Sequence, residues 1–136
     1  MTHELSILDA HPLGSGPIDR SKLVECIQSC FDCAQTCAGC ADVCLSEEAA
    51  AELTKCIHAT LDCFDICAAT GKILSRNGSI NGDITRAVLQ ACRTACKTCA
   101  EECGPQGFTR RHCAVCAGAC RRCEQTCNTL LASLAQ

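Results

Sequence analysis

The spacing of the cysteines constrains the fold of this chain more than any other feature. Eighteen cysteines occur in 136 residues, and almost all lie three or four positions from the next. Because an α-helix repeats every 3.6 residues, this spacing places each run of sulfurs on one face of a helix, where a bundle normally has leucine or isoleucine. The pattern therefore predicts a helical core built of thiols. The runs are Cys26, Cys30, Cys33, Cys37, Cys40 and Cys44; Cys56, Cys63 and Cys67; Cys92, Cys96, Cys99 and Cys103; and Cys113, Cys116, Cys120, Cys123 and Cys127.

The sequence around these runs predicts four helices preceded by an arm. Residues 1–18 include two prolines and two glycines near their end, and we expect an arm with one short turn at most. Residues 19–136 are expected to form one all-α domain, an antiparallel up-down-up-down four-helix bundle, because the connections are short. The predicted helices run from an Asp19 cap to Leu45, from a Ser46 cap to Ser75, from Asp83 to a stop at Gly104–Pro105, and from a Thr109 cap to Leu134.

Composition and charge narrow the class of protein. The chain has three phenylalanines and no tryptophan or tyrosine, so bound metal is expected to contribute to its stability. A net charge of −3 argues against a nucleic-acid partner. No targeting segment or membrane-spanning stretch is visible. We therefore expect a cytoplasmic protein, and in that reducing compartment cysteines serve as metal ligands or catalysts more often than as disulfides.

The cysteines divide into eight C-x-x-x-C pairs, with Cys56 and Cys113 left over. Two sulfurs four residues apart on a helix converge on one small ion. Such pairs of soft thiolates suit Cu(I), whereas Zn²⁺ prefers four ligands in a tetrahedron. Charge also favours copper, because four thiolates around Zn²⁺ carry a net charge of about −2 in a buried core. Roughly one Cu(I) per thiolate, on the order of eighteen ions per chain, leaves the core neutral.

The two ends of the predicted bundle differ. Both leftover cysteines lie at one end, together with Cys44 and Cys103, and we expect a polar mouth there. His112 lies roughly 60° off the cysteine face of its helix and is predicted to be a ligand at this mouth. His58 faces away from its cysteines and is expected at the surface. At the opposite end the cysteine faces run out into a predicted apolar plug of Leu23, Leu74, Leu89 and Leu130.

Further apolar residues lie off the cysteine face of the first two helices, and they are interpreted either as helix packing or as an oligomer interface. They are Val24, Ile27, Phe31, Ile57, Leu61 and Phe64.

Residues 19–134 resemble the cytosolic branch of the four-helix-bundle copper storage proteins. The resemblance rests on four cysteine-lined helices with repeated C-x-x-x-C pairs. It implies storage of many Cu(I) ions at thiolates inside a preformed bundle, and a homotetramer. The eighteen cysteines match the family by their position on the inner face of the helices. His112 matches it only by its location at the mouth. Thr60 occupies a position where a further cysteine would fit. The secreted branch has an export signal and methionines at the mouth, and this chain has neither.

Two other classes of function stay open. A metallothionein-like buffer for zinc or cadmium would use the same thiols in tetrahedral sites, at about four or five ions per chain. An enzyme, such as a thiol oxidoreductase or an iron–sulfur protein, would need an exposed cysteine with a perturbed pKa or a cluster motif, and the sequence has neither. We expect a non-enzyme that binds copper ions, with no nucleic-acid or membrane partner. The sequence does not identify the copper donor or recipient.

Overall fold

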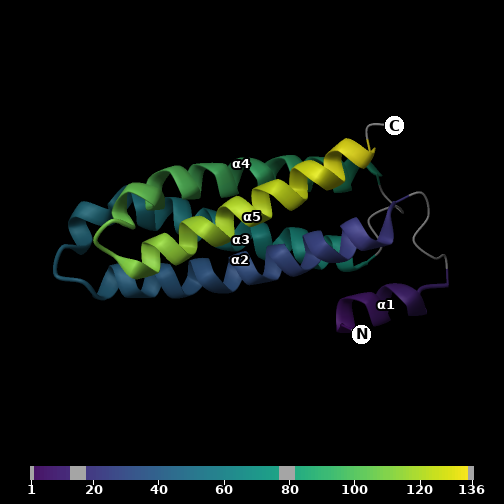
Figure 1. The fold of residues 1–136 in the computed structure, drawn as a ribbon, viewed down its shortest axis with the longest axis horizontal. Coiled ribbons are helices and arrows are strands. Elements are labelled where there is room, and N and C mark those ends of the chain that lie inside the picture. Colours follow the sequence, from purple (N-terminus) through teal and green to yellow (C-terminus); the bar gives the residue numbers. More distant parts are fainter. Residues whose placement is uncertain (1, 13–17, 77–81, 135–136) are drawn as a thin grey trace.

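Four long helices form the body of the protein (Figure 1). The computed structural model describes residues 2–12, 18–76 and 82–134, and within this part there are helices and turns but no strand. No helix among these residues is long and apolar enough to cross a membrane. The elements are α1 (His3–Ala10), α2 (Arg20–Ser46), the 3-10 helix η1 (Ala50–Leu53), α3 (Thr54–Ser75), α4 (Gly82–Gln106) and α5 (Arg111–Leu134).

The long helices pack in chain order around one core. Helix α2 contacts α3, α3 contacts α4, α4 contacts α5, and α5 closes the ring by contacting α2. Figure 1 shows the connections α2–α3 and α4–α5 at one end and the two termini at the other. The predicted all-α, up-down-up-down four-helix bundle is therefore confirmed.

Several predicted helix ends are confirmed. The Asp19 carboxylate accepts a hydrogen bond from the Lys22 backbone N–H at 3.2 Å, and α2 begins at the next residue, Arg20. Helices α3 and α5 end at Ser75 and Leu134, as predicted. The predicted loop at 76–83 and the predicted arm linker lie mostly outside the described residues.

The predicted start of the second bundle helix is wrong. Ser46 does not cap α3 but ends α2, and its hydroxyl donates to the carbonyl of Asp42 at 2.8 Å. A turn and η1 follow, and α3 begins only at Thr54. The turn buries Leu53, which is 2% exposed, in the end of the bundle. Burial of this side chain outweighs the high helix propensity of the alanines and glutamates around it.

The predicted stop at Gly104–Pro105 is also wrong, because α4 continues through both residues to Gln106. Pro105 removes one backbone hydrogen bond, but only one helical residue follows it, so the cost is confined to the last turn. A Cβ atom on Gly104 would lie 3.0 Å from the guanidinium of Arg121. This glycine therefore leaves room for the Arg121 side chain and does not mark a helix end.

The turn between α4 and α5 is shorter than predicted and lies later in the chain, at residues 107–110. Thr109 lies within it and donates its backbone N–H to the carbonyl of Gln106 at 3.2 Å. Helix α5 begins at Arg111, so Thr109 is not its cap. A Cβ atom on Gly107 would come within 3.0 Å of Ala114. Glycine at this position lets the turn fold back against the first turn of α5.

The N-terminal arm contains more helix than one turn. Thr2 caps α1 by accepting a hydrogen bond from the backbone N–H of Leu5 at 3.3 Å. Leu8 is buried where α1 packs on α2 and α3. An ion pair of 2.6 Å joins Asp9 to Arg20 at the start of α2. The arm is thus attached to the bundle along one side (Figure 1).

Apolar residues off the cysteine face join α2 to α3 within one chain. Ile27 and Ile57 are buried, and Phe31 packs against the core. The Phe31 ring covers Gly71, where a Cβ atom would lie 2.9 Å from the ring. Helix packing accounts for these residues, whereas Leu61 keeps an exposed side chain.

Candidate metal-binding site

All eighteen cysteines lie inside the bundle as free thiols. Each of the four long helices contributes one inward-facing row, as the spacing predicts. Only Cys40 and Cys56 have any exposed surface, 3% each. The core thus holds a column of sulfur atoms that is almost sealed from solvent.

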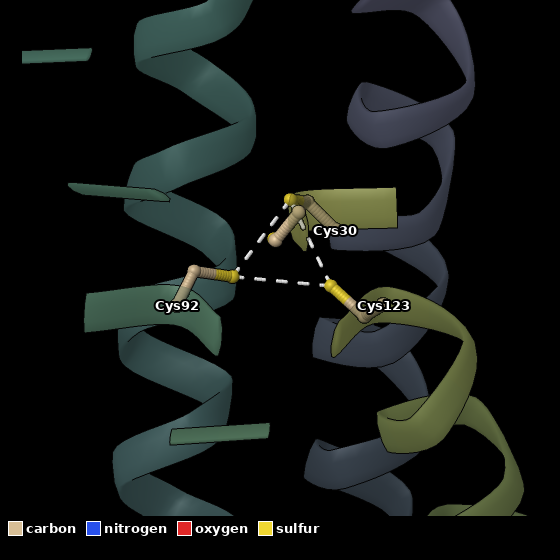
Figure 2. A group of neighbouring side chains, drawn as sticks. Cys30, Cys92 and Cys123 are labelled. Carbon is tan, nitrogen blue, oxygen red and sulfur yellow. Dashed lines mark hydrogen bonds between the residues drawn. The ribbon is translucent and has the colours of Figure 1, made fainter. Parts of the chain in front are cut away.

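Sulfurs from different helices lie close enough to share one ion. Figure 2 shows Cys30 of α2, Cys92 of α4 and Cys123 of α5, whose Sγ atoms form a triangle. The Cys30–Cys92, Cys92–Cys123 and Cys123–Cys30 distances are 4.0, 3.8 and 3.9 Å. A metal–sulfur bond of about 2.3 Å places trigonal sulfurs about 4.0 Å apart and tetrahedral sulfurs about 3.8 Å apart. The triangle therefore has the size of a metal–thiolate site.

The sulfurs form overlapping groups and not separate sites. In each group, the ligand atoms lie within 4.8 Å of one another. Cys33, Cys37, Cys63 and Cys120 each belong to at least two groups, so neighbouring groups share thiols. Shared thiols suit ions with few ligands and bridging sulfurs better than isolated tetrahedra. The groups include Cys30, Cys92, Cys123 and Cys127; Cys33, Cys63, Cys67 and Cys96; Cys33, Cys37, Cys63 and Cys120; and Cys37, Cys99, Cys116 and Cys120.

A mixed nitrogen and sulfur group lies near the α4–α5 turn. It consists of Cys40, Cys44, Cys113 and His112, with their ligand atoms within 4.8 Å of one another. The Nε2 atom of His112 is 3.4 Å from the Cys44 sulfur, and the Cys44 and Cys113 sulfurs are 4.0 Å apart. The structure thus brings His112 to the thiols at the predicted end. His58 is exposed, as expected.

Two charged residues at this end were not singled out from the sequence. The Nε atom of Arg110 donates to Glu47 Oε2 at 2.6 Å. The other carboxylate oxygen of Glu47 is 3.5 Å from Nε2 of His112. Glu47 and Arg110 belong to different connections, α2–α3 and α4–α5, so no spacing rule links them. Their ion pair holds the two connections together beside the outermost sulfurs.

Burial keeps the Cys44 and Cys113 thiols at this end protonated. It raises the pKa of Cys44, and the charge of Cys56 adds to the effect. For Cys113, burial first and then the charge of Cys44 raise the pKa to about 12. A Cu(I) ion that binds here must therefore displace protons. The neutral thiols of Cys44 and Cys113 also avoid the repulsion that two neighbouring buried thiolates would cause.

Cys56 and Cys103 form the closest sulfur pair. Their Sγ atoms lie 2.8 Å apart. Hydrogen bonding from Cys103 is the main cause that lowers the pKa of Cys56 to about 3, and Thr60 adds to it. The pKa of Cys103 is raised, mainly by hydrogen bonds with Cys116, Cys40 and Cys56. One partner of this pair thus holds the proton while the other has thiolate character.

The predicted apolar plug closes the opposite end of the column. Four fully buried leucines, one from each long helix, lie beyond the last cysteines, and they are Leu23, Leu74, Leu89 and Leu130. Thr70 and Thr85, which the sequence analysis did not single out, are also buried. The Thr70 hydroxyl donates to the carbonyl of Ile66 at 2.7 Å, so it leaves no unpaired polar atom.

A helical bundle filled with a continuous array of thiols defines a class of cysteine-lined metal storage proteins. The sequence pattern of the family described as copper storage protein matches residues 19–132. This chain belongs to that family. No curated protein is similar enough to this chain to count as a match.

Solved structures of a copper storage protein from Streptomyces lividans, Ccsp, are similar to this chain. The form loaded with 10 copper equivalents has a TM-score of 0.92 and 48% identity, and the match covers 96% of this chain and 98% of that chain. A form of the cytosolic protein loaded with five coppers has a TM-score of 0.80 and 51% identity, over 82% and 93% of the two chains. A double histidine-to-alanine mutant has a TM-score of 0.84 and 51% identity, over 87% and 99%.

Proposed function

We propose that this protein stores Cu(I) in the cytosol, with the ions held between the cysteine thiolates inside the bundle. The observation that carries this proposal is the array of overlapping sulfur groups along the whole core. Copper-loaded structures of a relative with 48% identity support the choice of metal. The copper storage protein of Streptomyces lividans is described as cytosolic, which supports a cytosolic location for this protein. The storage domain is residues 19–136, and residues 1–18 are its arm.

All eighteen cysteines are ligands in this proposal, and His112 is a ligand at the end near Cys44. Each Cu(I) replaces thiol protons, and each shared sulfur bridges neighbouring ions. About one Cu(I) per thiolate keeps the interior uncharged, which predicts on the order of eighteen ions at saturation. Thr60 supplies an oxygen where a sulfur would otherwise lie, so its neighbourhood holds fewer thiolates.

The bundle is preformed in this proposal. The fully buried leucine plug and the contacts of Phe31 with Gly71 stabilise the four helices without any metal. Copper then adds stability because it binds the folded chain better than the unfolded one. Circular dichroism of the reduced, metal-free protein checks this feature, and a predominantly helical spectrum is expected.

A zinc or cadmium buffer is the second candidate. Sulfur separations of 3.7 to 3.9 Å, as between Cys33 and Cys63 or between Cys37 and Cys120, also fit tetrahedral sites. The sharing of Cys33 and Cys120 between groups weighs against it, because a tetrahedral zinc site needs four ligands of its own.

We further infer a homotetramer and no catalytic activity. The homotetramer follows from the resemblance to the family, and exposed apolar side chains such as Leu61 support contact between copies. A storage role needs no reacting substrate, and the thiols are almost sealed from solvent.

Native mass spectrometry after growth with copper or with zinc tests the function. Copper storage predicts a mass increase of far more than about five ions per chain in copper medium. A zinc buffer predicts about four or five zinc ions and no larger copper load. The same spectra give the number of chains per particle.

A further inference from the structure

The sealed core raises the question of where copper passes in. Cys40 and Cys56 are the two cysteines with exposed surface, 3% each. At the end near Cys56, Leu53 is 2% exposed and packs in the core, and the ion pair between Glu47 and Arg110 joins the two connections. Cys40 lies one helical turn before Cys44 on α2, and a groove on the side of the bundle leads to it.

A shallow groove between α2 and α5 leads to Cys40. Its volume is about 530 Å³, and its lining includes Gly39, Cys40, Val43, Arg111, His112 and Val115. This volume is in the range of sites for small molecules. Two of the lining residues, Cys40 and His112, belong to the mixed metal-binding group with Cys44 and Cys113. The groove therefore lies beside two members of this group.

We propose that this groove binds the Cu(I) complex of a small thiol that carries a carboxylate, and that copper passes from this complex to Cys40. The inference rests on the proposed copper storage function and adds the chemical class of the donor and its binding site. It differs from the open end expected from the sequence, because the access route lies on the side of the bundle.

The charge and shape of the groove fit such a complex. Cu(I) bound by two thiolates is an anion, and carboxylates add further negative charge. Arg111 is exposed and has no ion-pair partner among the described residues, so its guanidinium is available to a carboxylate. The protein as a whole has a net charge of −3 and repels an anionic donor, so the local positive charge of Arg111 is needed to attract it to the groove.

The apolar part of the lining suits the carbon atoms of the thiol. Val43 and Val115 are 42% and 54% exposed on the two helices that form the groove. Gly39 leaves the groove open beside Cys40, because a Cβ atom there would meet nothing within 4 Å. This open space beside Cys40 leaves room for a small thiolate complex in the groove.

Transfer is a ligand exchange in which copper stays Cu(I). The Cys40 sulfur forms a new Cu–S bond, one carrier Cu–S bond breaks, and the Cys40 thiol proton passes to the departing thiolate. Cys44 or Cys113, whose sulfurs are 4.0 Å apart, then replaces the second carrier thiolate in the same way. The carrier leaves as two neutral thiols. The step needs no oxidant or reductant.

Stopped-flow loading of the full chain with two matched donors tests the proposal. The donors are the Cu(I) complexes of N-acetylcysteine and of N-acetylcysteine amide, which differ only in the carboxylate. Gly39→Leu fills the groove and should slow loading from both donors by roughly tenfold, because the reacting sulfur and copper can no longer approach closely. Arg111→Gln should slow loading from the N-acetylcysteine complex by about two- to fivefold, as expected for one exposed ion pair, and leave the amide complex unaffected.

Two control variants make equivalent changes elsewhere. Ala91→Leu adds similar bulk to a groove between α3 and α4, and Lys97→Gln removes one exposed positive charge from α4. Both should load at the wild-type rate. Loading of Gly39→Leu at the wild-type rate from both donors would overturn the proposal and point to the end near Cys56. If Arg111→Gln slows both donors equally, the carboxylate contact is wrong.

The final copper content separates this proposal from the storage function. A variant that loads slowly but reaches the wild-type copper content has an intact core and an impaired access route. If the wild-type protein itself fails to take up many Cu(I) ions, the storage function is wrong. If it fills from both donors and Gly39→Leu fills equally fast, only the groove assignment is wrong.

Discussion

The hydroxyl of Thr60 lies 3.4 Å from the sulfur of Cys103, at a position on the inner face of α3 where the sequence pattern expects a cysteine. Thr60 is fully buried, and it also lies 3.6 Å from the sulfur of Cys99. Its hydroxyl donates to the carbonyl of Cys56 at 2.6 Å. One oxygen thus takes the place of one ligand in the thiol array.

Replacing Thr60 by cysteine is expected to restore the missing ligand. The variant should bind about one more Cu(I) per chain, because the added thiolate balances one more unit of positive charge. An anaerobic Cu(I) titration of Thr60→Cys beside the wild type measures the difference. Thr60→Val, which keeps the shape without a metal-binding atom, should show the wild-type capacity. Equal capacities of Thr60→Cys and Thr60→Val would contradict the role assigned to this position.

The leucine plug is expected to stabilise the fold without affecting copper capacity. Leu89 is fully buried, so Leu89→Ala should lower the free energy of unfolding of the metal-free protein by about 2–5 kcal/mol. Anaerobic urea unfolding measures this loss, and the copper titration should give the wild-type number of ions. Leu45 is 59% exposed at the other end of the bundle, and Leu45→Ala is a matched control with little expected effect. A large loss of copper capacity in Leu89→Ala would show that the plug belongs to the metal site.

The sequence was sufficient for the thiol core because helical periodicity fixes which residues face inward. It was not sufficient for the connections. Residues 47–53 have high helix propensity, yet burial of Leu53 imposes a turn that only tertiary packing reveals. Gly104 was interpreted as a helix stop, whereas it permits contact between α4 and the Arg121 side chain.

The same limit applies to the candidate metal site. Cysteine spacing predicted which sulfurs face the core along each helix, and the bundle topology brought Cys44 and His112 to one end. The groove at Cys40 and the ion pair of Glu47 with Arg110 depend on the relative placement of segments far apart in the chain. No local pattern in the sequence encodes those contacts.

The metal-free protein is expected to lose stability in alkaline solution. The pKa of Cys113 is raised from 9 to about 12, mainly by burial, and the pKa of Cys44 is raised for the same reason. Above about pH 9 the unfolded chain releases its thiol protons while the folded chain retains them, so the unfolded state is favoured as the pH rises toward 12. This contribution to stability is complete below about pH 9 and declines above it.

Urea unfolding of the reduced, metal-free protein at about pH 8 and about pH 10.5 checks this expectation. Cys113→Ala should show a smaller decline than the wild type, because one of the responsible thiols is gone. Unfolding free energies that are equal at the two pH values would contradict the assignment of protonated thiols to this end of the core.

His112 is expected to hold copper in the outermost group. Its Nε2 atom lies 3.4 Å from the Cys44 sulfur, so His112→Leu removes one nitrogen ligand and leaves the cysteines in place. The total capacity should fall by at most about one ion, while a chelator should extract the first copper ions faster than from the wild type. His58→Leu on the exposed face of α3 is the control and should match the wild type. Identical extraction from the His112 variant and the wild type would remove His112 from the ligand set.

We propose that the thiol column is one continuous store for Cu(I). An anaerobic Cu(I) titration of the reduced protein, followed by competition with a Cu(I) chelator, measures its capacity. We expect tight binding of more than about ten Cu(I) per chain, since about one ion per thiolate neutralises the core. Saturation at about one to four ions, as expected for a few isolated sites, would contradict it.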